Sequence, residues 1–375
     1  AHGAPAMSAW TLEGLSAATR ALVPEVPAFL EQDGCDDAAF DAMARRLFAH
    51  QYEHNEPLRR FCQRRGLTPR RVQTWRDIPA VPINAFKDVT LSCEPVPACE
   101  RVFMTSGTTR AEVRGCHHHP TIAVWDVSMR RNFAARFMRG EPRRPMAILF
   151  PPETELGNSS LARYLSQAVR EFGTADSAWY LSARGMDLAG LRARLREAER
   201  SGRPLSVLGA SYGFVHLLDA MAQDGETVRL PAGSRLLDTG GYKRQSRELA
   251  LDDFYGQLSQ ALGLPRTHCI NMYGMTELSS QFYDAGNAVV PSVKRGMHWI
   301  RSRVVDPLTG AEVPRGQVGV LAHCDLASFN STTTILTEDL GVAVEGGFQL
   351  LGRAEGAQAR GCSLAVQEFL QGARG

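Results

Sequence analysis

Lysine is the residue that this chain of 375 amino acids most conspicuously lacks. Only Lys87, Lys243 and Lys294 occur among its 42 basic residues, so any reaction that needs a lysine has three candidates. The chain also lacks an excess of charge of one sign, because 40 acidic residues leave a formal net charge of only +2. The composition therefore gives no reason to expect a nucleic acid or an anionic membrane as a partner.

Long apolar runs are also missing, since no stretch approaches the roughly 18 apolar residues of a membrane-spanning helix. The eight cysteines are scattered without a secretory signal, so we expect free thiols in a reducing compartment and a cytoplasmic protein. Residues 1–6 precede Met7, and we expect them to be a cloning remnant outside the fold.

The pattern of apolar residues predicts an α/β fold with a mixed or largely parallel sheet. Residues 38–65 are typical of an amphipathic helix or helix pair, which predicts a helical N-terminal cap. Short apolar runs then alternate with longer helical patterns, as in βαβ units. Strands are expected at 146–150, 205–208, 236–237 and 318–321, and helices at 159–172, 187–200, 213–223 and 246–262.

From about residue 295 the chain changes to short strands with Gly and Pro turns, which indicates a small β-rich subdomain. We therefore expect five segments. They are the remnant 1–6, a helical cap and linker at 7–95, an α/β core at 96–295, the β-rich part at 296–350, and a short C-terminal segment at 351–375.

The strongest local motif is a hydroxyl-rich loop that follows an apolar stretch. Its central residues are Thr105, Ser106, Gly107, Thr108 and Thr109. Such a loop can surround phosphate oxygens with hydroxyl and backbone N–H groups, although an ordinary Ser/Thr turn would look the same. The Walker A lysine pattern is absent from the sequence, so a P-loop NTPase is not supported.

Two further motifs follow along the chain. In the stretch 271–277, an aromatic residue could stack on a purine and Glu277 could hold Mg²⁺. In the stretch 337–353, Asp339 and Arg353 could bind the vicinal hydroxyls of a ribose. Taken singly, a buried tyrosine or an Asp-Leu-Gly turn would be unremarkable.

Together and in this order, the three motifs resemble the signature of the adenylate-forming superfamily, which includes acyl-CoA ligases and firefly luciferase. The resemblance covers residues 103–353 and implies the N-terminal core of that superfamily, with ATP as substrate and Mg²⁺ as cofactor. It implies that Thr105–Thr109 hold phosphates, that Glu277 holds Mg²⁺, and that Asp339 and Arg353 hold the ribose. Thr276 and Glu277 are implied catalytic residues. The implied adenine contacts are Gly240, Gly241, Tyr242, Asn271, Tyr273 and Gly274.

Two features depart from that pattern. Arg110 stands where a glycine usually closes the phosphate loop, and no lysine follows Lys294, although the superfamily carries a catalytic lysine in a mobile C-terminal domain. The resemblance therefore implies a truncated C-terminal domain, and we expect arginine or metal to replace the lysine.

A narrower resemblance fits these departures. The stretches 48–52, 78–87 and 352–364 are similar to those of the acyl-protein synthetases of bacterial luminescence, over nearly the whole chain. That family activates a fatty acid as acyl-AMP, passes the acyl group to its own cysteine, and then to an NADPH-dependent reductase. The corresponding cysteine is Cys362, and nearby Arg353 and Arg360 give a route to a lowered thiol pKa.

Other readings remain open. Direct transfer to coenzyme A or a carrier protein would make Cys362 a buried structural thiol. The string 209–213 is Gly-x-Ser-x-Gly, which predicts a serine hydrolase with Ser211 as nucleophile and His323 among its partners. A degenerate, non-catalytic nucleotide-binding scaffold is a third reading, which intact Glu277, Asp339 and Arg353 disfavour. The cluster Cys116–His119 is not expected to bind metal, because neighbouring residues of a strand point to opposite faces.

Overall fold

The computed structural model describes residues 12–106, 113–240 and 246–374. These residues form two compact units. Unit 1 comprises the chain up to Arg131, Thr276–Ser280 and Gly296 onward, and unit 2 comprises Asn132–Met275 and Gln281–Arg295. This division differs from the five expected segments, because the N-terminal helices and the β-rich part belong to the same unit.

Unit 2 is built on a six-stranded sheet with the order β11-β10-β9-β8-β4-β5. The pairs β4–β5, β4–β8, β8–β9 and β9–β10 are parallel, and β11 is antiparallel to β10 at the edge. Its strands are β4 (Met146–Leu149), β5 (Ala178–Trp179), β8 (Ser206–Ala210), β9 (Arg235–Thr239), β10 (Cys269–Tyr273) and β11 (Phe282–Tyr283). The predicted strands at 146–150, 205–208 and 236–237 are confirmed.

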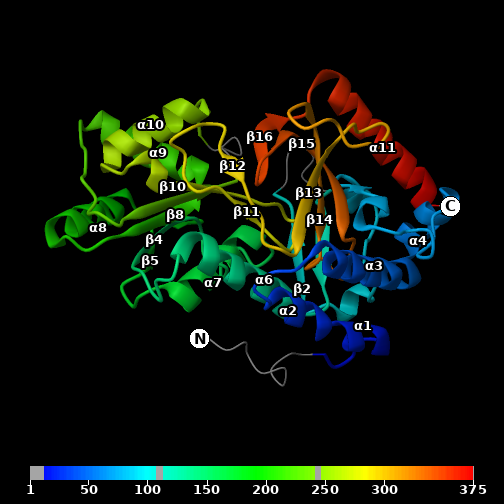
Figure 1. Cartoon of the computed structure of the whole chain (residues 1–375). Helices are drawn as coiled ribbons and strands as arrows, with labels where there is room; N and C mark the ends of the chain where they lie inside the picture. The colour runs from blue at the N-terminus through cyan, green and yellow to red at the C-terminus, as the bar shows by residue number, and fades with distance from the viewer. Residues whose placement is uncertain (1–11, 107–112, 241–245, 375) are drawn as a thin grey trace. The chain divides into compact units, whose positions relative to one another are not determined.

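Helices cover both faces of this sheet (Figure 1). The expected helices are confirmed as α7 (Ser160–Phe172), α8 (Leu188–Ser201), α9 (Ser211–Gln223) and α10 (Leu251–Leu262). Apolar residues of α8, α9 and α10 share one core with Val207 and Leu236. Figure 1 shows α7 on the other side of the strands. Because helices cover both faces, every residue of β4 and β8 is buried, which explains their continuous apolar runs.

Smaller elements complete unit 2. They are the π-helical turn η4 (Ala134–Met138), the hairpin β6 (Leu181–Ser182) and β7 (Gly185–Met186), the 3₁₀ turn η5 (Arg266–His268), and β12 (Val293–Lys294). Helix α6 (Ala123–Phe133) carries the chain from unit 1 into unit 2.

Unit 1 contains an antiparallel sheet in the order β16-β15-β14-β13, and β1 pairs with β15 in parallel. The strands are β1 (Val81–Pro82), β13 (Ile300–Val305), β14 (Val318–Asp325), β15 (Thr334–Val344) and β16 (Gly347–Arg353). The predicted strand at 318–321 is confirmed within β14. A separate hairpin joins β2 (Arg101–Met104) to β3 (Cys116–His119).

The predicted N-terminal helix pair is also confirmed, and it packs against the last helix of the chain. The helices are α1 (Ala17–Leu22), α2 (Glu25–Leu30), α3 (Asp37–His54), α4 (Glu56–Arg64), α5 (Ala85–Asp88) and α11 (Gly356–Arg374), with 3₁₀ turns η2 (Trp75–Asp77) and η3 (Val96–Ala98). Phe61 of α4 lies against Phe369 of α11, with ring centroids 4.8 Å apart. Figure 1 shows α4, in blue, beside α11, in red.

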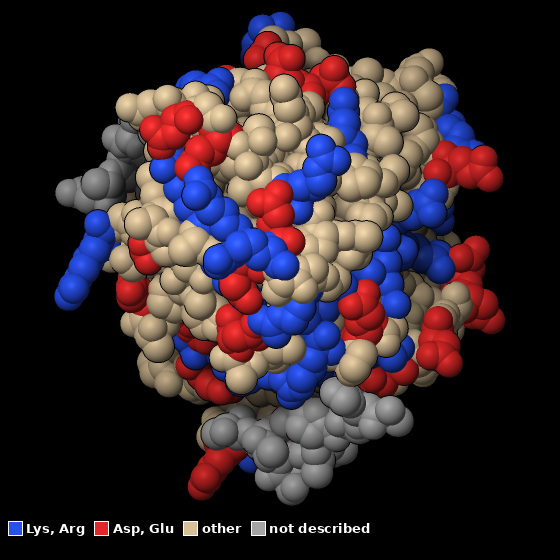
Figure 2. Space-filling view, turned by 90° about the vertical axis from the view of Figure 1, so that its left-hand side faces the viewer, with Lys and Arg blue, Asp and Glu red and all other residues tan. Residues whose placement is uncertain are grey.

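The charged side chains of unit 2 are mostly paired. Arg192 of α8 binds Asp224 at 2.6 Å, and Arg247 binds Asp219 at 2.7 Å. Figure 2 shows basic and acidic side chains interspersed over the face that lies to the left in Figure 1. This mixture agrees with the near-zero net charge and offers no extended basic surface on that face. None of the described helices is long and apolar enough to cross a membrane.

Candidate functional site

The candidate residues fall into two groups, one on each unit. Unit 1 carries the first phosphate-loop residues, the metal candidate and the ribose candidates, and unit 2 carries the adenine candidates. The unit 1 group is Thr105, Ser106, Thr276, Glu277, Asp339, Arg353 and Cys362, and the unit 2 group is Gly240, Asn271, Tyr273 and Gly274. Gly107, Thr108, Thr109, Gly241 and Tyr242 lie outside the described residues.

The predicted phosphate loop leaves β2 and returns in β3, so it connects a hairpin. Two hydrogen bonds close its base: the Thr105 N–H donates to the Gly115 carbonyl, and the Gly115 N–H donates to Thr105 Oγ1, both at 3.0 Å. Ser106, the next residue, is exposed. The hydroxyl of Thr105 therefore holds its own loop together at this point.

The segment that contains Thr276 and Glu277 is anchored on both sides. The Thr276 carbonyl lies 2.9 Å from His117 Nδ1, which must donate to it, and His117 Nε2 then accepts from Ser331 Oγ at 3.1 Å. Burial lowers the pKa of His117 to about 4, so the ring is neutral. Three residues after Glu277, the Ser280 hydroxyl donates to the buried carboxylate of Asp325 at 2.7 Å.

His117 belongs to the Cys116–His119 cluster, and its role could not be read from the sequence. The rings of His117 and His119 lie on one side of β3, with centroids 4.2 Å apart, as the alternation of a strand requires. The contact to Thr276 makes His117 a support of the Glu277 segment. Only the fold brings these two motifs together, because 159 residues separate them.

Glu277 is the most unusual carboxylate of the site. Its residue is only 4% exposed, and within the described ranges no other side chain donates a hydrogen bond to its carboxylate. A Cβ atom on Gly115 would lie 3.2 Å from its Oε1 and 3.2 Å from Thr105 Cγ2, so glycine at 115 leaves room for the carboxylate. Burial raises the pKa of Glu277 to about 7, against a smaller lowering by a hydrogen bond from its own backbone N–H and by the charges of Lys87 and Arg353.

The ribose candidates face each other across two neighbouring strands. Asp339 of β15 pairs in register with Arg353 of β16, and their side chains form an ion pair at 3.3 Å. The guanidinium also lies 3.8 Å from Glu338, whose carboxylate accepts a hydrogen bond from the Asn84 side chain at the start of α5. Sequence reasoning missed Asn84 and Glu338, since neither belongs to a motif with an obvious chemical role.

Cys362 does not have the activated environment that its neighbours in sequence suggested. It lies within α11, is 3% exposed, and its Sγ is 3.8 Å from the Thr337 carbonyl. Burial, with a further contribution from the Glu338 charge, raises the thiol pKa to about 11. The expected lowering by arginine is therefore wrong for this conformation, because carboxylates rather than guanidinium groups act on the sulfur.

The glycines around Cys362 differ from each other in role. Gly352 and Gly356 have positive φ angles of 119° and 55°, which glycine adopts without strain. Gly361 instead lies against Pro307, where an added Cβ would be 2.7 Å from Pro307 Cγ. Gly361 is thus a close-packing position, whereas Gly352 and Gly356 adopt backbone conformations that favour glycine.

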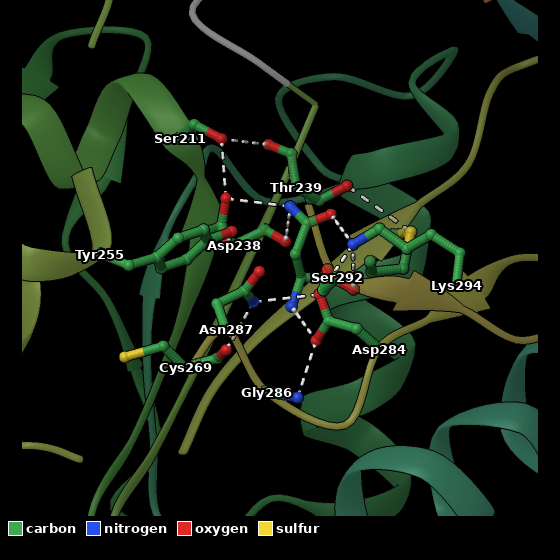
Figure 3. A network of polar contacts seen from close by, with 12 residues as sticks. Ser211, Asp238, Thr239, Tyr255, Cys269, Asp284, Gly286, Asn287, Ser292 and Lys294 are labelled. Carbon is green, nitrogen blue, oxygen red and sulfur yellow. Dashed lines mark hydrogen bonds and ion pairs between the residues drawn. The ribbon is translucent and has the colours of Figure 1, made fainter. Parts of the chain in front are cut away.

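In unit 2, Asn271 is held by a buried polar network at the ends of β9 and β10 (Figure 3). Its Nδ2 donates to Asp238 Oδ2 at 3.1 Å, and its Oδ1 accepts from Lys294 Nζ, which forms an ion pair with Asp284 at 2.8 Å. The hydroxyl of Tyr255 donates to Asp238 Oδ1 at 2.8 Å. Burial raises the pKa of Asp238 to about 6. Asn271 is therefore an anchored residue in the middle of β10.

The other adenine candidates lie at the same strand ends. Tyr273 is the last residue of β10 and is 9% exposed, with its ring 6.0 Å from that of Phe282. Gly274 follows it, and Gly240 follows β9 with a φ of 78°. The carboxyl ends of adjacent parallel strands are the usual ligand-binding edge of an α/β sheet, and the adenine contacts stay a prediction.

Ser211 sits at the predicted strand-to-helix turn, between β8 and α9. Its hydroxyl donates to Asp238 Oδ2 at 3.0 Å, with the Thr239 carbonyl at 3.3 Å, so its proton is committed to the network of Figure 3. His323 belongs to unit 1, contacts Ser302 at 2.8 Å, and has its pKa lowered to about 3 by burial. These contacts indicate structural roles for both residues and do not support a hydrolase triad.

Sequence comparison gives a family match over most of the chain. The profile described as "Acyl-protein synthetase, LuxE" matches residues 29–371. A "Long-chain-fatty-acid--luciferin-component ligase" of Vibrio harveyi is 22% identical over 340 residues, covering 87% of this chain and 86% of that protein. The protein of the same name from Aliivibrio fischeri is 22% identical over 350 residues, covering 88% of each.

Comparison with solved structures supports the fold. A 2-hydroxyisobutyryl-CoA ligase in complex with 2-HIB-AMP aligns over 84% of this chain and 67% of its own, with 16% identity and a TM-score of 0.62. ATP-bound MatB from Rhodopseudomonas palustris aligns over 69% of this chain and 49% of its own, with 18% identity and a TM-score of 0.50. At these identities, the likeness concerns the fold of the core.

The burial of Glu277 predicts a pH-dependent contribution to stability. Its folded pKa of about 7 lies above its ordinary value of 4.5, so the contribution is fully present below about pH 4.5 and is lost as the pH rises through about 7. At 1.36 kcal/mol per pKa unit, ionisation in the folded state costs about 3 kcal/mol by pH 8. Glu277→Gln should therefore gain stability over the parent by about this amount between pH 4.5 and pH 8, measured by urea unfolding. An unchanged difference across this range would contradict the prediction.

The network of Figure 3 predicts that Lys294 is required for stability. Lys294→Met removes the Nζ donor from Asn271 and Asp284 while Asp284 stays buried, which should lower the free energy of unfolding by about 2–4 kcal/mol. Urea unfolding measures this loss. The matched control is Lys87→Met, whose exposed side chain should change stability by less than about 0.5 kcal/mol. Equal losses in both variants would contradict a structural role for the network.

Proposed function

Because this chain belongs to the acyl-protein synthetase (LuxE) family, we propose that it activates a carboxylic acid with ATP as an acyl adenylate and transfers the acyl group to a thiol. The observation that carries the proposal is the carboxylate of Glu277, which is 4% exposed and lacks a hydrogen-bond partner among the described side chains. A buried carboxylate that no side chain pairs with is costly to ionise unless a cation compensates it. An ATP-dependent reaction would bring that cation to the site.

Mg²⁺ fits the donor set of unit 1. It prefers oxygen ligands and commonly uses one or two carboxylates together with substrate phosphates. Glu277 would hold the ion, and the hydroxyl of Thr105, near the same Gly115, lies where the phosphate loop begins. When bound, the ion would supply charge neutralisation for the phosphates. The raised pKa of Glu277 means that binding a cation would also release a proton near neutral pH.

In the first step, a carboxylate oxygen of the acid attacks the α-phosphorus of ATP, and the bond from that phosphorus to the bridging oxygen of pyrophosphate breaks. The products are the acyl adenylate and pyrophosphate. Asp339 and Arg353 would bind the ribose hydroxyls from their facing positions on β15 and β16. The protein would contribute orientation and charge stabilisation rather than a covalent intermediate at this stage.

In the second step, the thiolate of Cys362 attacks the acyl carbonyl carbon, and the bond from that carbon to the phosphate oxygen of AMP breaks. The proposal requires α11 to move, because Cys362 is buried and its thiol pKa is raised to about 11. Gly352 and Gly356, with their positive φ angles, flank the connection from β16 to α11 and would permit this movement. Leaving the carboxylates of Glu338 and Asp339 would favour the thiolate.

The acid is proposed to be a long-chain fatty acid, the substrate class named for the Vibrio harveyi and Aliivibrio fischeri relatives. The acyl group would then pass from Cys362 to a partner such as an acyl reductase. Coenzyme A or a carrier protein is the alternative acceptor, and direct transfer to it would leave Cys362 without a covalent role.

The first test is acid-dependent exchange of labelled pyrophosphate into ATP, with a panel of fatty acids of different lengths. The parent should exchange label with at least one acid. Glu277→Ala should lower the exchange rate at least about 100-fold while remaining folded, because the metal would lose its ligand. The control is Glu345→Ala, which removes an exposed carboxylate from the same unit and should retain exchange. Full exchange by folded Glu277→Ala would remove Glu277 from the metal site.

The second test separates self-acylation from direct transfer. ATP and a labelled acid should leave a hydroxylamine-sensitive label on the parent, because hydroxylamine cleaves thioesters. Cys362→Ser should lose this label and keep pyrophosphate exchange, since the thiol acts only in the second step. Cys35→Ser, a partly exposed cysteine of unit 1, should keep both. Label retained by Cys362→Ser would place the acceptor elsewhere, and no label on the parent would favour direct transfer to coenzyme A or a carrier.

A further inference from the structure

Helix α5 contacts the unit 1 site from two sides. Phe86 Cβ would lie 3.5 Å from a Cβ atom on Gly115, and the same position is 3.2 Å from Glu277 Oε1. Asn84, the residue before the helix, donates a hydrogen bond to the Glu338 carboxylate beside Asp339. The next residue after Phe86 is Lys87, so its amino group is carried by a helix packed against the site.

Lys87 is a cation of this region that makes no ion pair with any described residue. Arg353 is engaged with Asp339 at 3.3 Å and with Glu338 at 3.8 Å. The side chain of Lys87 is exposed and makes no ion pair within the part of the chain that the structure describes. Because Lys87 follows Phe86, whose side chain packs beside Gly115, its amino group extends from a helix at the edge of the site and is left for another anion.

The remaining lysines differ from Lys87. Lys294 is 4% exposed and bound to Asp284 within the network of unit 2, and Lys243 lies outside the described residues. On unit 1, the carboxylates of Glu277, Glu338 and Asp339 would repel the triphosphate of ATP unless cations offset them. A lysine ammonium is a compact charge with three donors, which suits phosphate oxygens.

We propose that Lys87 is the phosphate-binding cation of this site, and that its Nζ donates hydrogen bonds to the β- or γ-phosphate of ATP and then to the leaving pyrophosphate. The inference rests on the proposed adenylation function. The sequence led us to expect that arginine or metal replaces the missing C-terminal lysine. In this proposal, Lys87 provides a positive charge at the phosphates instead. Because the leaving pyrophosphate gains negative charge as the bond to the α-phosphorus breaks, Lys87 also accelerates the first step.

The test compares nucleotide binding by calorimetry, with ATP and with AMP in the presence of Mg²⁺, for the parent, Lys87→Ala and Lys87→Arg. Lys87→Ala should weaken ATP binding by about 10- to 100-fold, the effect of one charged hydrogen bond. Its affinity for AMP should stay within about twofold, since AMP lacks the β- and γ-phosphates. Lys87→Arg should recover part of the ATP affinity.

The matched control is Arg374→Ala, which removes a positive charge that pairs with Asp88, the neighbour of Lys87 on α5. This variant should bind ATP as the parent does. Equal loss of ATP and AMP affinity in Lys87→Ala would indicate a general disturbance and overturn the proposal. Unchanged ATP affinity in Lys87→Ala, or a raised KM for the acid alone, would also overturn the role of Lys87. The proposed adenylation by the parent would then still stand. A parent that neither binds ATP nor exchanges pyrophosphate would overturn both proposals.

Discussion

The burial of the Glu277 carboxylate is the constraint on which the unit 1 site depends. The protein holds the Thr276–Ser280 segment in place through the neutral ring of His117 on one side and the carboxylate of Asp325 on the other. Glycine at position 115 then leaves the space that the carboxylate fills. These contacts hold a carboxyl group where water is largely excluded, so its charged form is disfavoured unless a cation compensates it.

Much of the fold could be predicted because its signals are local. Alternation of apolar runs and amphipathic segments located α7 to α10 and the central strands within a few residues. The three motifs could be assigned in order because each contains its own residue types. The Gly-x-Ser-x-Gly string at 209–213 shows the limit of local signals. It occupies the predicted strand-to-helix turn, but the Ser211 hydroxyl donates to Asp238 and does not have the surroundings of a nucleophile.

The contacts that sequence reasoning missed join residues that are far apart along the chain. Cys362 was expected to be activated by Arg353 and Arg360, but the folding of α11 onto β15 brings its sulfur to the Thr337 carbonyl and the Glu338 charge instead. Lys87 belonged to a stretch that carried only the family resemblance. Its position next to Phe86, and hence near Gly115 and Glu277, is a consequence of tertiary packing.

The central claim, that the acid is joined to AMP before the acyl group moves, is tested most directly by following an oxygen atom. A carboxylic acid labelled with ¹⁸O in its carboxylate is incubated with ATP, Mg²⁺ and the parent protein, and the released AMP is examined by mass spectrometry. If an acyl adenylate forms, one ¹⁸O atom passes from the acid to the phosphate of AMP. Released AMP without ¹⁸O would contradict the account, because the acid would then not have attacked the α-phosphorus.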